Sequence, residues 1–324
     1  MKALLCRQHG LPDTLVYDDI DDPTPEADDV VVDVKAAGVN FPDVLIIQNK
    51  YQAKPALPFA PGAEFSGVVS AIGRNVTDRR VGDRVIGSVT YGAFAEKVKL
   101  PASRTIQMPP SLDFERGAAF LLTYGTSYHA LVDRGALQAG ETLLVLGAAG
   151  GVGLAAIEIG KALGARVIAA ASSAEKLAVC REHGADEFID YSTEDLRERL
   201  RAITGGRGPD VIYDPVGGGY AEPAFRSIAW RGRYLVIGFA NGEIPKLPLN
   251  LALLKGAAIV GVFWGQYTQL EPASFHADVE RMFGWITEGK LNPHISARFS
   301  LAEGARALEH LLARRATGKV VVLP

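Results

Sequence analysis

A glycine-rich loop near the middle of the chain has the residue types that a phosphate group needs around it. Residues 147–153 read Gly-Ala-Ala-Gly-Gly-Val-Gly and follow the apolar run 143–146. Small residues here let the chain turn sharply out of a strand, bring the backbone close to a pyrophosphate, and let the next helix pack against the sheet. The N–H groups at the start of that helix then face the phosphates.

The spacing of this loop fits the dinucleotide fingerprint, with Ala148 in the place of the first glycine. The alternative is a structural turn in some other α/β protein, but the strand before the loop and the helix after it favour a cofactor site. We expect that the loop binds the pyrophosphate through Ala148, Gly150, Gly151, Val152 and Gly153.

The end of the next strand-like run indicates which dinucleotide is bound. An NAD site has a carboxylate roughly 20 residues past the glycines, and Ala171 stands there in this chain. Because no carboxylate stands at this position, none would repel the 2′-phosphate of NADPH. Ser172 and Ser173 can donate hydrogen bonds to that phosphate, and Lys176 can supply charge. Ser172 could also cap the following helix, and Lys176 could be an ordinary surface residue; both alternatives are compatible with phosphate binding. The sequence therefore predicts NADPH rather than NADH.

Strand-like and helical stretches alternate from about residue 111 to residue 264. Continuous apolar strands that alternate with helices predict a parallel sheet with both faces covered. The predicted strands are 142–146, 166–170, 187–189, 211–213, 234–237 and 258–263, and the predicted helices are 152–163, 175–183, 194–203 and 221–229.

The N-terminal part has a different pattern, with short β-type runs at 30–36, 65–72, 84–87 and 94–100. Many short strands with little helix between them predict a barrel or a sandwich. After Trp264 come predicted helices at 276–288 and 302–314 and a strand at 319–323. This tail is too short to be a domain alone, so we expect it to return to the N-terminal part.

Composition excludes several classes of function. The chain has 324 residues, of which 48% are apolar, and a net charge of −3, which argues against nucleic acid or an anionic membrane as the main partner. The two cysteines, Cys6 and Cys180, lie too far apart in sequence to form a metal clip or a redox motif. No run is long enough to cross a membrane, and we expect a cytoplasmic protein.

Taken together, the motifs resemble the zinc-independent quinone oxidoreductases of the medium-chain dehydrogenase/reductase superfamily, which are similar to zeta-crystallin. The resemblance covers essentially the whole chain. It is carried by Ala37–Asn40, Pro61–Gly67, Val81–Val85, Thr126–Leu131, Gly147–Gly153, Gly238–Gly242 and Gly318–Val321.

The resemblance implies an α/β fold, in which a Rossmann domain with a doubly wound parallel sheet is inserted in a β-rich, GroES-like catalytic domain. The expected limits are residues 1–121 and 265–324 for the catalytic domain and residues 122–264 for the Rossmann domain, with the active site in the cleft between them.

The resemblance also implies chemistry without a metal. Zinc-dependent relatives have a cysteine at the position of Asn40 and a histidine at the position of Ala63, and two cysteines cannot supply a structural four-cysteine site. Negative charge on the substrate oxygen must then be stabilised by hydrogen-bond donors. The expected catalytic residues are Asn40 and Tyr51. The alternatives are that Asn40 caps a turn and that Tyr51 is an aromatic residue at a loop rim.

Further cofactor contacts follow from the resemblance alone. The nicotinamide and its ribose are expected near Thr126, Phe239, Ala240, Asn241 and Phe263. Tyr191 is expected near the adenosine phosphate, and Arg315 is expected to close over the cofactor. Tyr191 could instead belong only to a strand end and helix cap, and Arg315 to a solvated basic pair with Arg314.

We therefore expect an NADPH-dependent quinone oxidoreductase that transfers hydride without a metal. One alternative is an NADPH-dependent reductase of α,β-unsaturated carbonyls or enoyl thioesters, which needs an acid such as Tyr51 to protonate carbon. Another is a non-catalytic NADPH-binding protein with a structural or regulatory role. In similar proteins the strand at 257–263 pairs with its twofold mate, so we expect a homodimer.

Overall fold

The computed structural model describes residues 1–324, and contacts divide the chain into two compact units. The first unit contains residues 1–122 and 293–324, and the second contains residues 123–292.

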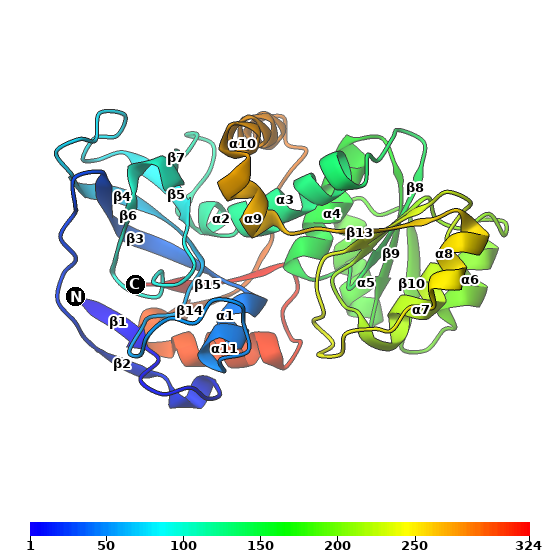
Figure 1. Cartoon of the computed structure of the whole chain (residues 1–324), viewed down its shortest axis with the longest axis horizontal. Coiled ribbons are helices and arrows are strands. Elements are labelled where there is room, and N and C mark those ends of the chain that lie inside the picture. The colour runs from blue at the N-terminus through cyan, green and yellow to red at the C-terminus, as the bar shows by residue number, and fades with distance from the viewer. The chain divides into compact units, whose positions relative to one another are not determined.

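A seven-stranded sheet forms the centre of the first unit, with the strand order β14-β15-β3-β4-β5-β7, and β6 also pairs with β3 (Figure 1). Register shifts along the β3–β4 ladder bend the sheet. The strands of this sheet are β3 (Asp29–Val39), β4 (Glu64–Ile72), β5 (Arg84–Ser88), β6 (Lys97–Pro101), β7 (Thr105–Gln107), β14 (Ile295–Ser300) and β15 (Lys319–Leu323). A separate two-stranded sheet contains β1 (Lys2–Leu5) and β2 (Val16–Asp19), and the α-helices of the first unit are α1 (Phe41–Ile47), α2 (Phe114–Ala118) and α11 (Gly304–Leu312).

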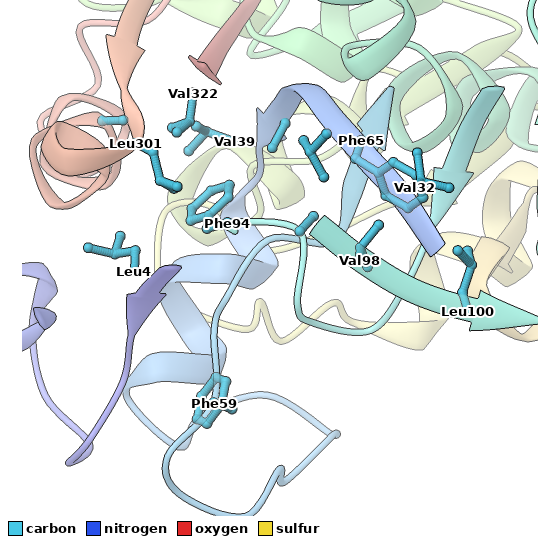
Figure 2. Close-up of a cluster of buried hydrophobic side chains, with 14 of the residues drawn as sticks. Leu4, Val32, Val39, Phe59, Phe65, Phe94, Val98, Leu100, Leu301 and Val322 are labelled. Atoms are coloured by element: carbon cyan, nitrogen blue, oxygen red, sulfur yellow. The ribbon is translucent and has the colours of Figure 1, made fainter. Parts of the chain in front are cut away.

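The C-terminal strand is an integral part of this N-terminal sheet. β15 pairs antiparallel with β3, with Val320 opposite Val39, and parallel with β14. Figure 2 shows Val322 beside Val39 in the core cluster, together with Leu301 and Phe94. The tail from residue 293 onward therefore completes the hydrophobic core of the first unit.

The second unit is built on a six-stranded parallel sheet with the order β10-β9-β8-β11-β12-β13 (Figure 1). This is the doubly wound order of a dinucleotide-binding domain, so the predicted fold class is confirmed. β8 is buried along its whole length, because helices cover both faces of the sheet. The strands are β8 (Thr142–Leu146), β9 (Arg166–Ala171), β10 (Glu187–Asp190), β11 (Val211–Asp214), β12 (Arg233–Val236) and β13 (Ala258–Gly261).

The α-helices of the second unit are α3 (Leu121–Tyr128), which begins at the boundary, α4 (Gly151–Ala162), α5 (Ala174–Glu182), α6 (Leu196–Ile203), α7 (Ala221–Arg226), α8 (Leu249–Lys255), α9 (Trp264–Leu270) and α10 (Pro272–Thr287). A π-helical segment at His129–Arg134 continues α3. No helix is both long and apolar enough to span a bilayer.

Residues 265–292, which the sequence analysis assigned to the catalytic domain, belong to the second compact unit. Helices α9 and α10 pack against α3 and its continuation: the ring of Tyr267 stacks on His129 at 4.0 Å, and Trp285 lies 5.7 Å from Tyr128. The indole of Trp264 lies against Gly125, where a Cβ would come within 2.7 Å of it. These aromatic contacts join the segment to α3, and sequence periodicity could not reveal them.

Candidate functional site

The glycine loop forms a tight turn between β8 and α4. Gly147 has a φ of +57°, and the N–H of Gly150 donates to its carbonyl oxygen at 3.0 Å. At Gly153 a Cβ would lie 2.5 Å from the carbonyl oxygen of Ala148, so only glycine fits there. The N-cap of α4 is Gly150, and no side chain occupies the first N–H groups of this helix. These groups and the missing Cβ fit the pyrophosphate of a dinucleotide.

Two buried hydroxyl groups hold the start of α4 in place. Ser127 donates its hydroxyl hydrogen to the carbonyl oxygen of Val152 at 3.0 Å, and its oxygen lies 2.8 Å from the hydroxyl of Tyr213. Because a serine has only one hydrogen to donate, the phenol of Tyr213 must be the donor to Ser127. The neighbouring Thr126 is half-buried on α3.

The residues predicted to bind the 2′-phosphate lie together at the end of β9. The ammonium of Lys176 donates to the hydroxyl oxygen of Ser172 at 3.1 Å, and Ser173 accepts from the backbone N–H of Lys176 at 3.4 Å as the N-cap of α5. The alternative that Ser172 caps the helix is therefore wrong, because the cap is the next residue, Ser173. The backbone N–H of Tyr191 donates to the carbonyl oxygen of Ala171 at 3.1 Å, so β10 brings Tyr191 to the same place.

The loop after β12 is tied to the loop after β11. The N–H of Ala240 donates to Pro215 O at 3.0 Å, and that of Asn241 donates to Val216 O at 2.9 Å. The carboxyl ends of parallel strands share one edge of the sheet, where doubly wound proteins bind ligands. Phe239, Ala240 and Asn241 therefore lie on the predicted edge, and Phe263 follows β13 with an exposed ring.

An apolar pocket lies beside Phe239, but its polar groups are already satisfied. Asp214 accepts hydrogen bonds from the hydroxyl of Tyr234 and from the N–H groups of Val216 and Gly217. A binding pocket needs a few convergent polar groups to orient its ligand, and here the one carboxylate already accepts three hydrogen bonds from the protein. The remaining lining residues are Val236, Gly238, Ile244, Pro245, Leu247 and Ile259.

Arg315 belongs to the first unit, where it follows α11 and is exposed. Its predicted contact with the cofactor stays a prediction.

The first unit contains a buried polar cluster at the end of β3. The ammonium of Lys319 donates to Asn40 Oδ1 at 2.6 Å, to Glu64 Oε1 at 2.5 Å and to Val39 O at 3.1 Å. Lys319, Glu64 and Asn40 are each at most 5% exposed. The sequence analysis assigned no role to Lys319, although a lysine that opens the otherwise apolar run Lys319–Leu323 is a visible signal.

Asn40 is already saturated as a hydrogen-bond donor. Its amide nitrogen donates to Glu64 Oε1 at 2.9 Å and to Gly38 O at 3.2 Å, which uses both amide hydrogens. Its backbone N–H donates to the carboxylate of Asp43 at 2.8 Å, and Asn40 is the N-cap of α1. Asn40 therefore occupies the N-cap position of α1 through its backbone, while its side-chain amide bonds Lys319, Glu64 and Gly38. Donation to a substrate would require one of these bonds to be released.

Two titratable groups close to this cluster have shifted pKa values. Burial raises the pKa of the Asp43 carboxyl to about 7, against the smaller opposing effects of its backbone hydrogen bond from Asn40 and of the Lys319 charge. Burial, and then the charge of Asp43, raise the pKa of the Tyr51 phenol. Tyr51 is half-buried and packs on the core of the first unit. Its phenol is therefore protonated at neutral pH.

Position 63, where zinc-dependent relatives have a histidine, holds a buried alanine here, and its side chain has no atom that could bind a metal. The chain contains no group of three or more His, Cys, Asp or Glu side chains that could hold a metal ion.

Comparisons with known proteins agree with both units. The family described as "Alcohol dehydrogenase GroES-like domain" matches residues 26–110, and the family described as "Zinc-binding dehydrogenase" matches residues 151–283. The chain is 39% identical to a quinone oxidoreductase-like protein 2 homolog of Nematostella vectensis, over 99% of this chain and 88% of the relative. It is also 39% identical to a quinone oxidoreductase of Pseudomonas aeruginosa, over 100% of this chain and 99% of that relative.

Solved structures give the same result. The Escherichia coli quinone oxidoreductase complexed with NADPH is 29% identical, with a TM-score of 0.93 and complete coverage of both chains. The CurK enoyl reductase is 26% identical, with a TM-score of 0.89 and coverage of 99% of this chain and 98% of that one.

The buried carboxyl of Asp43 predicts a specific pH dependence of stability. Its pKa of about 7 lies above the ordinary value of 3.8 for an aspartate, so the contribution of this carboxyl to stability is complete below pH 4 and is lost as the pH rises through 7. Relative to Asp43→Asn, the wild-type free energy of unfolding should fall by up to about 1.4 kcal/mol per pH unit between pH 4 and 7. Urea unfolding of both proteins across this range measures the difference.

Asp19→Asn is the matched control, because a hydrogen bond from Lys2 lowers the pKa of this exposed carboxyl. The stability difference between wild type and Asp19→Asn should stay nearly constant between pH 4 and 7, because a lowered pKa changes stability only at lower pH. Parallel stability curves for wild type and Asp43→Asn would contradict the assignment of a raised pKa to Asp43.

Proposed function

The chain belongs to the quinone oxidoreductase family of the medium-chain dehydrogenase/reductase superfamily, and on that premise we propose that it reduces a quinone with hydride from NADPH, without a metal. The observation that carries the proposal is the end-to-end similarity, at 39% identity, to a bacterial quinone oxidoreductase. The buried alanine at position 63 supports a mechanism without zinc.

NADPH is proposed as the cofactor because of the residues at the end of β9. Ala171 provides no carboxylate, while Ser172, Ser173 and Lys176 lie together, and the backbone of Tyr191 is bonded to Ala171. A 2′-phosphate at this place would be met by hydroxyl donors and one positive charge. The similar Escherichia coli enzyme is described as complexed with NADPH, which is consistent with this proposal.

NADPH, when bound, supplies the hydride. The chain's own groups must then stabilise the negative charge that develops on the substrate oxygen. We assign this donor role to the Tyr51 phenol, since both amide hydrogens of Asn40 are bound inside the protein. Asn40 contributes through its backbone at the N-cap position of α1, the helix that precedes Tyr51. Quinones accept hydride readily, so positioning of the substrate can supply much of the rate.

Reduction of an α,β-unsaturated carbonyl or an enoyl thioester is the second candidate. The structural similarity to the CurK enoyl reductase favours it. That reaction requires protonation of a carbon atom, so it depends on an acid more strongly than quinone reduction does. The phenol of Tyr51 is the group that separates the two candidates.

We also propose that the protein forms a homodimer through β13. This strand ends the sheet and pairs only with β12, so its outer edge carries unpaired backbone groups. Exposed apolar side chains surround it: Ile259 is 38% exposed, Phe263 58% and Leu253 80%. Pairing of β13 with the same strand of a second copy would satisfy the backbone groups at this edge and cover these side chains.

The cytoplasmic location stays a prediction.

The proposed activity is tested by the initial rate of NADPH oxidation with a simple 1,4-quinone and, separately, with a short enoyl thioester. Quinone turnover in the wild type would support the quinone reductase, and a donor role of Tyr51 predicts that this turnover falls about 10²-fold in Tyr51→Phe, because phenylalanine has no hydrogen to donate. Thioester turnover that falls about 10²–10⁴-fold in the same variant would instead support an enoyl reductase with Tyr51 as the acid. If NADPH is not oxidised with either acceptor, both candidates are contradicted.

Cofactor choice is tested by Lys176→Ala. Loss of a charged hydrogen bond to the 2′-phosphate should weaken NADPH binding by about tenfold or more, while NADH binding should be unchanged. Fluorescence titration with each nucleotide measures the two dissociation constants. Lys161→Ala is the control, because Lys161 forms a surface ion pair with Asp186 in the same unit. An equal loss for both nucleotides in Lys176→Ala would argue against phosphate recognition.

The dimer is tested by Ile259→Lys, which places a charge on the free edge of β13. Sedimentation should give a dimer for the wild type and a monomer for the variant. Leu11→Lys is the control, since Leu11 is a 57% exposed apolar residue of the first unit. A wild-type monomer at micromolar concentration would count against the proposal.

A further inference from the structure

Lys319 is the only side chain of the buried cluster at the end of β3 that carries a positive charge, and all of its hydrogens are used. The strand β15 holds it next to β3, and the side chain is 4% exposed. Its three ammonium hydrogens match three acceptors: Val39 O, Asn40 Oδ1 and Glu64 Oε1. A buried ammonium with a full set of acceptors is tightly fixed in position, because each lost bond would leave a desolvated charge.

Glu64 is fixed as firmly from the opposite side. Its Oε1 accepts from Lys319 and from the Asn40 amide, and its Oε2 accepts from the N–H of Leu122 at 3.0 Å. The side chain also fills the space beside Gly38, where a Cβ would lie 2.6 Å from Glu64 Oε1. The carboxylate is therefore held by three hydrogen bonds, in space that a side chain at position 38 would occupy.

These two charges allow only one orientation of the Asn40 amide. An ammonium can only donate hydrogen bonds and a carboxylate can only accept them. The amide oxygen must therefore face Lys319, and the amide nitrogen must face Glu64. A flipped amide would place its hydrogens against the ammonium and its oxygen against the carboxylate.

We propose that Lys319 is a positioning residue of the reductase: its ammonium fixes the Asn40 amide and thereby the start of α1, the helix that carries Asp43 and leads to Tyr51. This inference rests on the proposed function, in which Tyr51 donates to the substrate. Asn40 transmits the effect through its own backbone at the N-cap position of α1: its N–H donates to the Asp43 carboxyl at 2.8 Å, and its carbonyl oxygen accepts from the N–H of Asp43 at 3.1 Å. A misplacement of about 1 Å at a reacting group can cost roughly 10²-fold in rate.

A purely structural ion pair is the competing explanation, and two variants separate it from a positioning role. Lys319→Met leaves the Glu64 carboxylate buried without its cation, which should destabilise the protein strongly. The double variant Lys319→Met/Glu64→Gln removes both charges, so stability should largely return. The double variant still lacks the donor that orients Asn40 Oδ1, so a positioning role predicts that activity does not return with stability.

Three measurements are made on the full-length protein: kcat/KM for the quinone, the dissociation constant of NADPH, and amide hydrogen exchange of the peptide covering residues 37–48. In the double variant we expect kcat/KM to fall about 10²-fold, NADPH affinity to stay at the wild-type value, and exchange in this peptide to rise. Lys97→Met is the matched control, because Lys97 pairs with Asp22 on the surface of the same unit; it should change none of the three.

Wild-type kcat/KM and wild-type exchange in the stable double variant would overturn the proposal and leave Lys319 with a structural role. If the wild type reduces neither quinone nor thioester, the proposed function fails instead. The exchange measurement then still decides whether Lys319 fixes the start of α1.

Discussion

A buried ammonium needs an acceptor for each of its hydrogens, and this requirement at Lys319 determines how the two ends of the first unit meet. The acceptors come from the end of β3, from the residue that follows it and from β4. β15 must therefore lie against β3 in one register, with Val320 opposite Val39. A slip by one residue would turn Lys319 to the other face of the sheet, and both the charge and the apolar side chains after it would be misplaced.

A different constraint, close approach of backbone atoms, organises the second unit. At Gly153 the space for a side chain is taken by the carbonyl oxygen of Ala148, so α4 packs closely against the turn that precedes it. The hydroxyl of Tyr213 bonds to that of Ser127, which in turn donates to the carbonyl oxygen of Val152 and so holds the first turn of α4. A nucleotide-binding turn thus depends on a missing side chain in one place and on two buried hydroxyl groups in another.

Sequence reasoning identified the elements whose signals are local. The strands 142–146 and 319–323 were predicted with their observed limits, because an apolar run bounded by turn residues is a strong signal. The strand β14, whose side chains alternate between half-buried and exposed, and the exposed helix α8 were missed. The wrong serine was considered as the cap of α5, since Ser172 and Ser173 are adjacent and only geometry distinguishes them. The role of Lys319 depends on partners that are more than 250 residues away in sequence, and no local pattern contains that information.

The hydrogen-bond donors of the first unit that remain available indicate which substrate class the site favours. Both amide hydrogens of Asn40 are bound, which leaves the phenol of Tyr51 as the proposed donor. Burial and the charge of Asp43 raise the pKa of this phenol, and an acid whose pKa lies far above the working pH transfers its proton less readily. It can still donate a hydrogen bond to a developing oxygen anion. Reduction of a quinone needs only that hydrogen bond, whereas reduction of an enoyl group needs a proton at carbon, so the environment of Tyr51 favours the quinone.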